Sequence, residues 1–289
     1  MKATKFTSAV QQSGGVTRKK LRQLKSRRLK FPLSLERRYT TAISRYLEKQ
    51  WKEYTAMVVE MILPRQDAVD DLSPGVGEYG PSYDTVLGIA EGFNKFNKKE
   101  WKAFLEIAIG AAFNEDEFWV AMTLERWSRE QVALITKASQ DMKDAVARRV
   151  RNSVKNGLLN SEIEKLILKE MPGISFRRAR VIARDQASKL TGELTHGRME
   201  EAGLETYIWS TAYDERVRGF KDPNTTPSHW VMEGKRCRWD DYSVYYENGE
   251  WVKRPDNAPI NHPGLEIMCR CIALPDWNEL NEISKERIQ

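Results

Sequence analysis

Soft metal ligands are concentrated between Thr211 and Cys271. All three cysteines and two of the three histidines lie in this segment. Cys269 and Cys271 stand one residue apart on an expected strand, which places both side chains on the same face. A His/Cys set of this kind is typical of tetrahedral zinc. A structural zinc site could therefore be drawn from His229, Cys237, His262, Cys269 and Cys271. We favour the alternative, in which buried reduced cysteines lie beside a hydrogen-bonded histidine.

Three aspartates of the same segment, Asp214, Asp240 and Asp241, are hard ligands of the kind used in metal-dependent phosphodiester chemistry. The alternative is a loop network, in which Asp214 bonds to turn backbone and Arg216 or Arg218 pairs with Asp240 or Asp241. We favour the network, because a nuclease also needs a base and converging carboxylates. Walker-type phosphate loops and the Gly-x-Ser-x-Gly and His-Glu-x-x-His motifs are absent from the sequence. We therefore expect no catalysis and no required cofactor.

These chemical residues belong to a string of motifs in a fixed order. A helix carrying Ala183-Arg184-Asp185-Gln186 precedes Asp214 to Arg218, Pro227-Ser228-His229, Gly234, Trp239-Asp240-Asp241, Pro263-Gly264 and Cys269-Arg270-Cys271. The string resembles the C-terminal domain of the phage Mu F-like head morphogenesis family, the minor head proteins of tailed phages. The resemblance runs from Arg177 to Ala273, and the ordered set is far more specific than any one motif. One departure is an insertion over Gly219 to Thr226, just before His229. The family-motif residues are Arg184, Asp185, Gln186, Asp214, Arg216, Arg218, His229, Gly234, Trp239, Asp240, Asp241, Cys269, Arg270 and Cys271.

This resemblance implies a minor head protein, a structural component of the virion inside the capsid at the portal vertex. During assembly it would be located in the host cytoplasm. The implied roles are head assembly, DNA packaging and DNA ejection. The implied partners are the portal protein, a scaffold or major capsid protein, and packaged DNA. The alternatives are a metal-dependent nuclease or toxin-like enzyme delivered with the genome, and a non-specific DNA-binding protein.

The net charge of +6 is concentrated at the N-terminus. Residues 1–30 hold ten basic side chains and no acidic one, and removing these ten from the 47 basic residues leaves 37 against 41 acidic residues. Such an arm is expected to be disordered alone and attracted to phosphate or to an acidic protein surface, with a solvated tail as the alternative. The residues expected to bind DNA or a partner are Arg18, Lys19, Lys20, Arg22, Lys25, Arg27, Arg28 and Lys30.

Helical periodicity follows the arm. Apolar and aromatic residues recur at helical spacing from Leu35 to Met61, which predicts a packing seam rather than a platform for stacking bases. Ser161 and Glu164 are expected to form the capping box of a short helix, and Gly203 to end a long one. Further helices are expected over 83–94, 99–113, 117–155 and 176–202. The turn over 171–175 resembles a helix-hairpin-helix, although we favour an ordinary helical connection.

After Gly203 the pattern changes to short β-like runs. Strands are expected over 205–211 and 269–274, and Asn248-Gly249 favours a type I′ hairpin between 242–246 and 250–253. The predicted fold class is α+β, in which a mostly helical N-terminal two-thirds precedes a short antiparallel sheet packed on a long helix. The predicted ranges are a basic disordered arm over 1–31, a helical domain over 32–174, an α+β domain over 175–275 and a tail over 276–289.

No apolar run approaches the roughly 18 residues that cross a bilayer. The lysines near the N-terminus are not followed by an apolar core, so no secretory signal is expected. An odd number of cysteines favours a reducing compartment. We therefore expect a soluble protein with no membrane partner.

Overall fold

The computed structural model describes residues 19, 23, 30–65, 69, 72, 80–109, 117–169 and 171–285. The chain divides into two compact units, each assembled from separate stretches of sequence. We call them the helical unit and the sheet unit. The helical unit comprises Ser34–Glu91 and Ala121–Ala183, and the sheet unit comprises Met1–Leu33, Gly92–Val120 and Arg184–Gln289.

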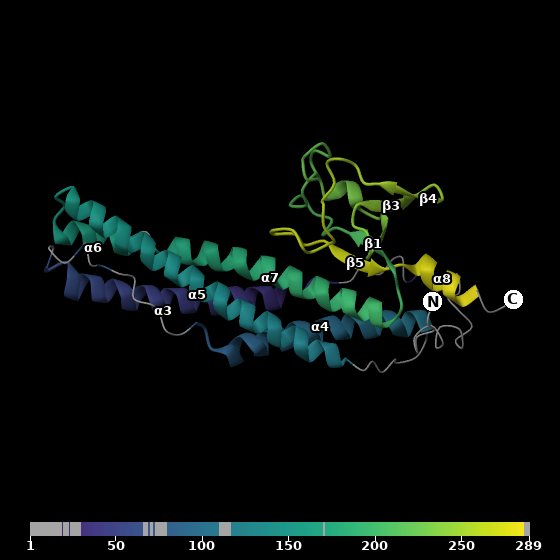
Figure 1. Ribbon diagram of the computed structural model, residues 1–289, viewed down its shortest axis with the longest axis horizontal. Coiled ribbons are helices and arrows are strands. Elements are labelled where there is room, and N and C mark those ends of the chain that lie inside the picture. Colours follow the sequence, from purple (N-terminus) through teal and green to yellow (C-terminus); the bar gives the residue numbers. More distant parts are fainter. Residues whose placement is uncertain are drawn as a thin grey trace. The chain divides into compact units, whose positions relative to one another are not determined.

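Long helices account for most of the described chain (Figure 1). They are α3 (Leu33–Met57), α4 (Tyr83–Ile109), α5 (Phe118–Lys155) and α7 (Met171–Glu201), together with the shorter α6 (Asn160–Lys169) and α8 (Trp277–Lys285). A π-helical turn, η1 (Val58–Ile62), continues α3. None of the helices in the described ranges is long and apolar enough to cross a membrane.

The predicted aromatic seam is confirmed as the core of the helical unit. Tyr39, Trp51 and Tyr54 of α3 are buried, and α3 lies beside α5 (Figure 1). The ring of Tyr39 packs against Trp127 with centroids 5.5 Å apart, and its hydroxyl donates to Gln131 Oε1 at 3.1 Å. Because these rings are enclosed by the neighbouring helix, they are not available to stack on bases.

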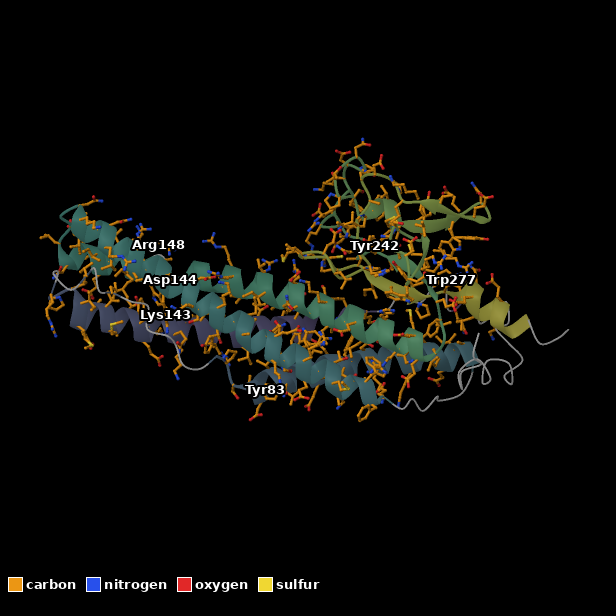
Figure 2. The ribbon with its side chains drawn as sticks, in the orientation of Figure 1. Tyr83, Lys143, Asp144, Arg148, Tyr242 and Trp277 are labelled. Carbon is orange, nitrogen blue, oxygen red and sulfur yellow. The ribbon has the colours of Figure 1, made fainter. Side chains whose placement is uncertain are left out.

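The C-terminal half of α5 is amphipathic, as its long periodic sequence predicts. Figure 2 labels Lys143, Asp144 and Arg148 on this stretch. Lys143 is buried and donates to Gln50 Oε1 of α3 at 3.0 Å, whereas Arg148 is exposed. One face of α5 therefore packs against α3 while the other carries charge.

A five-stranded antiparallel sheet forms the β part of the sheet unit. Its order is β4-β3-β2-β1-β5, and every residue of β1 is buried. The strands are β1 (Thr206–Ser210), β2 (Arg236–Arg238), β3 (Val244–Glu247), β4 (Glu250–Lys253) and β5 (Ile272–Pro275). The α+β fold class is thus confirmed.

The Asn248-Gly249 hairpin is confirmed between β3 and β4. Both turn residues have positive φ, 51° and 96°, as a type I′ turn requires. The core behind the sheet combines Trp101, Phe104 and Leu105 of α4 with Met199 of α7 and buried residues of the strands. The prediction that the long helix packs on the sheet is therefore also confirmed.

Several predicted helix boundaries were wrong. The stretches 83–94 and 99–113 form one helix, α4, as far as Ile109, and residues 110–116 lie outside the described ranges. The asparagines that weaken this helix, Asn94 and Asn97, bind a buried arginine, so tertiary contacts offset low propensity. The turn expected over 171–175 is the first part of α7, because proline is tolerated in a first helical turn.

Helix caps were predicted with mixed success. α6 begins at Asn160, so Glu162 rather than Glu164 reaches back to the cap, where it accepts from the Leu159 N–H at 2.8 Å. Gly203 does end α7, with φ of +75° and the Leu204 N–H bound to Met199 O at 2.8 Å.

Strand boundaries in the C-terminal region also differ from the prediction. The last strand begins at Ile272, after both Cys269 and Cys271, because its partner β1 ends at Ser210 opposite Ile272. β2 was not predicted. The stretch expected to be a tail contains α8, which begins at Trp277 (Figure 2).

Candidate functional site

His229, Cys269 and Cys271 form a buried cluster in the sheet unit. Their ligand atoms all lie within 4.8 Å of one another, and each residue is at most 6% exposed. His229 Nδ1 lies 3.4 Å from both the Cys269 and the Cys271 sulfur. On the other side of the ring, Nε2 lies 3.1 Å from Glu266 Oε2. The imidazole is therefore held between two thiols and a carboxylate.

The backbone around the cluster is fixed by turns on both sides. The N–H groups of His229 and Trp230 donate to Arg218 O at 3.0 and 3.1 Å. The Cys269 N–H donates to Glu266 O at 3.0 Å, after Met268 with φ of 61°. Ser188 of α7 donates through its hydroxyl to Cys269 O at 2.5 Å. The turn and the helix together set the direction of the two thiols.

Despite the insertion Gly219 to Thr226, His229 lies beside Cys269 and Cys271. Gly219, with φ of +84°, lies so close to Ser228 that an added Cβ would stand 1.9 Å from its hydroxyl oxygen. The Ser228 N–H donates to Asn257 O at 2.6 Å, and the Asn257 side chain donates to Pro223 O at 2.7 Å. The inserted residues therefore form a side loop whose two ends are tied together.

The cluster divides its charge unevenly. A hydrogen bond from Cys271 and the nearby His229 hold the pKa of Cys269 well below its ordinary value, against the effect of burial. The hydrogen bond with Cys269, together with burial, holds the pKa of Cys271 well above its ordinary value. Burial alone would lower the pKa of His229, but Cys269 and Glu266 raise it overall. These shifts favour the charged forms of His229 and Cys269 and the protonated form of Cys271.

A pocket of about 240 Å³ opens beside the cluster. His229, Cys269 and Cys271 line it, and four arginines contribute to the wall: Arg184, Arg216, Arg218 and Arg270. Arg270 Nη2 lies 2.8 Å from both Asp214 oxygens, and Arg218 Nη1 lies 3.2 Å from Glu266 Oε2. Arginines supply the guanidinium groups in the lining of this pocket, which suits a small anion.

Cys237 and His262 lie outside this cluster. His262 Nδ1 is 2.9 Å from the Tyr207 hydroxyl, which also accepts from Arg254 Nη2 at 3.2 Å. Cys237 is fully buried, and burial raises the pKa of its thiol. Of the five predicted zinc ligands, the structure brings three together.

Aromatic rings surround His262. Its ring lies 5.0 Å from Trp239 and 6.2 Å edge-on from Tyr242, which Figure 2 labels. His196 of α7 stacks on Trp239 with centroids 4.1 Å apart. Burial, followed by the charges of Arg254 and His196, lowers the pKa of His262 to about 4. This histidine is therefore neutral near pH 7.

The three aspartates are bound in a loop network, with different partners from those predicted. Asp214 Oδ1 accepts from the Arg216 N–H at 3.0 Å, as expected, and its carboxylate pairs with Arg216 and Arg270. Asp240 pairs with Arg238 rather than with Arg216 or Arg218. Asp241 accepts from Ser243. The specific pairing was wrong because Arg238, two residues before Asp240, is closer along the chain than either predicted arginine.

The remaining family-motif residues have structural positions. On α7, Asp185 is buried and its Oδ2 binds Lys189 at 2.8 Å and Gln186 at 2.9 Å. Gly234 has φ of +73°, and its N–H donates to Trp209 O at 2.8 Å. Asp185 therefore makes contacts within α7, and Gly234 ties its turn to β1.

The basic arm lies mostly outside the described residues. Within it the structure describes Lys19 and Lys30, and both are exposed. The predicted contacts of Arg18, Lys20, Arg22, Lys25, Arg27 and Arg28 lie outside the described ranges.

Glu266 was missed by sequence reasoning. Its Oε2 accepts a hydrogen bond from His229 Nε2 at 3.1 Å, and its Oε1 accepts from the Ile260 N–H at 3.3 Å. The only signal in the sequence is its position three residues before Cys269, which does not distinguish it from other surface glutamates.

Residues 144–274 match the family described as "Phage Mu protein F like protein". An uncharacterized protein of Haemophilus influenzae (strain KW20 / Rd) is 32% identical over 154 residues, covering 53% of this chain. The chain spans only 29% of that relative's length. No solved structure was found to match. The matched residues contain the His229, Cys269 and Cys271 cluster and the ordered motifs around it, so this region of the chain is similar to the phage Mu protein F like family.

Proposed function

We propose that the chain is a minor head protein of a tailed phage, acting inside the capsid near the portal vertex in head assembly, DNA packaging or DNA ejection. The observation that carries the proposal is the family match over 144–274, which supports a phage head-related protein. The ordered motifs from Arg184 to Cys271 lie in one unit, and Trp239, Cys269 and Cys271 belong to its core or pack against it. The family is one of structural phage proteins, so the proposal assigns no turnover to the site.

The geometry of the acidic residues supports a scaffold rather than a phosphodiesterase. Asp214 is held by Arg216 and Arg270, and Asp240 is held by Arg238. Among the described residues, the group of three or more His, Cys, Asp and Glu side chains with converging ligand atoms is the His229 cluster, which contains no aspartate. Ion-paired loops of this kind rigidify a surface for docking.

Partners follow from the same proposal. The portal protein is the main one, with a scaffold or major capsid protein as a further contact. Packaged DNA is assigned to the basic arm, whose ten positive charges within residues 1–30 match a phosphate backbone. The proposed location is the virion, at the portal vertex, after assembly in the host cytoplasm.

The decisive experiment is co-purification with the portal protein of the same phage. The full chain and a chain lacking residues 1–30 would be co-expressed with portal and isolated as assemblies. We expect both to co-purify if the folded units dock on portal. Failure of the full chain to co-purify, together with its absence from infectious particles, would overturn the proposal.

The arm is tested separately by DNA binding at several salt concentrations. Each phosphate that the arm neutralises adds about −0.9 to the slope of log affinity against log salt. Deleting residues 1–30 should flatten that slope. An unchanged slope would show that the arm does not contact DNA, without bearing on portal docking.

A further inference from the structure

We propose that His229 Nδ1 and the sulfurs of Cys269 and Cys271 bind a tetrahedral Zn²⁺ ion, whose fourth ligand is a water or an anion from the arginine-lined pocket. The inference is independent of the minor-head role. It replaces the predicted five-residue set by three ligands and one position open to the pocket. Donor sets of two cysteines and one histidine with an external fourth ligand occur among zinc proteins.

The spacing of the ligand atoms fits the ion. Zinc bonds of about 2.3 Å to sulfur and about 2.05 Å to nitrogen, at tetrahedral angles, put nitrogen and sulfur about 3.6 Å apart. The observed distance from His229 Nδ1 is 3.4 Å to each sulfur. Both thiols therefore stand where two ligands of one ion would stand.

The second side of the imidazole supports the same assignment. A metal-bound histidine usually donates its other ring N–H to a carboxylate, which fixes the tautomer and the ring orientation. His229 Nε2 lies 3.1 Å from Glu266 Oε2, and Glu266 is held in turn by Arg218 at 3.2 Å. This contact leaves Nδ1, the nitrogen that faces both thiols, free to bind the ion.

The sulfur environment also suits a bound thiolate. The Cys271 N–H approaches Cys269 Sγ at 3.3 Å, which stabilises negative charge on that sulfur. Any thiol that is still protonated releases its proton to solvent when the ion binds. Thiolate and imidazole together favour zinc over magnesium or calcium, which take oxygen ligands.

The fourth position is assigned to the pocket because the other predicted ligands are occupied elsewhere. His262 Nδ1 faces the Tyr207 hydroxyl at 2.9 Å, and Cys237 Sγ lies 3.8 Å from Lys235 O. The pocket itself is lined by all three proposed ligands. Water or a small anion can therefore reach the ion from that side.

A competing interpretation is a reactive cysteine with His229 as its base. A nucleophile and base pair needs one thiol facing the imidazole, whereas two thiols lie at the same distance from Nδ1. The two interpretations also differ in experiment, because a bound ion protects both thiols from alkylation until a chelator removes it.

The test is metal analysis of the full chain purified without added metal or chelator. We expect about one zinc per chain in the wild type and in Cys237→Ser, the matched control at a buried cysteine outside the cluster. The double variant Cys269→Ser, Cys271→Ser should lose the metal. Glu266→Gln should still bind it, with affinity reduced about 10–100-fold, because only the support of His229 is removed.

A second measurement covers the case in which the double variant does not fold. The wild-type chain, stripped of metal, is titrated with Co²⁺ and followed by absorption. We expect thiolate charge-transfer bands in the near ultraviolet and tetrahedral bands in the visible. A wild type that carries no zinc and gives no thiolate bands with Co²⁺, or rapid alkylation of Cys269 and Cys271 before any chelator is added, would overturn the proposal.

Discussion

Removing the charge of Glu117 should destabilise the sheet unit by several kcal/mol. The partner of this carboxylate is Arg198 of α7, whose side chain is 0% exposed. Arg198 Nε and Nη2 lie 3.0 and 2.9 Å from Glu117 Oε1, and the guanidinium also donates to Asn97 and Asn94 at 2.5 and 2.6 Å. Glu117→Gln removes the carboxylate charge that lies against this buried cation.

The magnitude follows from burial. Breaking a buried ion pair by neutralising one partner costs about 3–5 kcal/mol, because the remaining charge stays desolvated. A glutamine still accepts a hydrogen bond from Arg198, so we expect the lower end, about 3 kcal/mol. Glu117 also binds Lys98 at 2.6 Å, but that lysine is 36% exposed and adds at most about 1 kcal/mol.

The matched control is Glu125→Gln on α5. Glu125 pairs with Arg129 one helical turn away, and their side chains are 51% and 71% exposed. Loss of that pair should cost only about 0.3–0.5 kcal/mol. Urea unfolding of the full chain, followed by circular dichroism, measures both changes. Equal shifts for the two variants would refute the reasoning that burial sets the cost.

Three further predictions concern the sheet unit. Burial is the largest cause that lowers the pKa of His262 to about 4. The stability that depends on the neutral ring is therefore complete above about pH 6.5 and is lost as the pH falls toward 4. Melting temperatures that fall equally with pH in the wild type and in His262→Asn would contradict this. Asp214→Asn should lower the free energy of unfolding by about 1–3 kcal/mol, because the mostly buried Arg270 loses a charged partner at 2.8 Å. Chemical denaturation measures this free energy, and an unchanged value would count against a stabilising role of the Asp214 ion pairs. Gly249→Ala should lower the free energy of unfolding by about 1 kcal/mol, since φ is +96° and the space around the position is open. The control is Gly88→Ala at an exposed helical position. A smaller loss of stability for Gly249→Ala than for Gly88→Ala would disprove the strain argument.

Local signals predicted local structure. Asn248-Gly249 determines its hairpin through backbone conformations that few residues adopt, and Gly203 ends α7 for the same reason. The seam of α3 was predicted because its periodicity is long and regular. In each case, the residues that decide the structure are neighbours in the sequence.

Contacts between distant segments were not predictable in the same way. β2 was missed because its sequence, Arg236-Cys237-Arg238, has two charges in three residues. Arg236 is held by Asp276 at 2.5 Å and lies over the Tyr246 ring, contacts that form only in the folded sheet. The three-residue cluster was predicted within a larger set. Cys237 and His262 could be separated from it only in the folded structure, where both contact Tyr207 instead.

The interleaved order of the two units limits how the chain can be shortened. A fragment beginning at residue 175 would retain every family motif yet omit Trp101, Phe104 and Leu105, which belong to the same core as Tyr207 and Trp209. Its sheet would expose an apolar surface, and the fragment would tend to aggregate. During synthesis, too, this core stays incomplete until the ribosome has added Leu280, so the α4 residues must wait for their last partners.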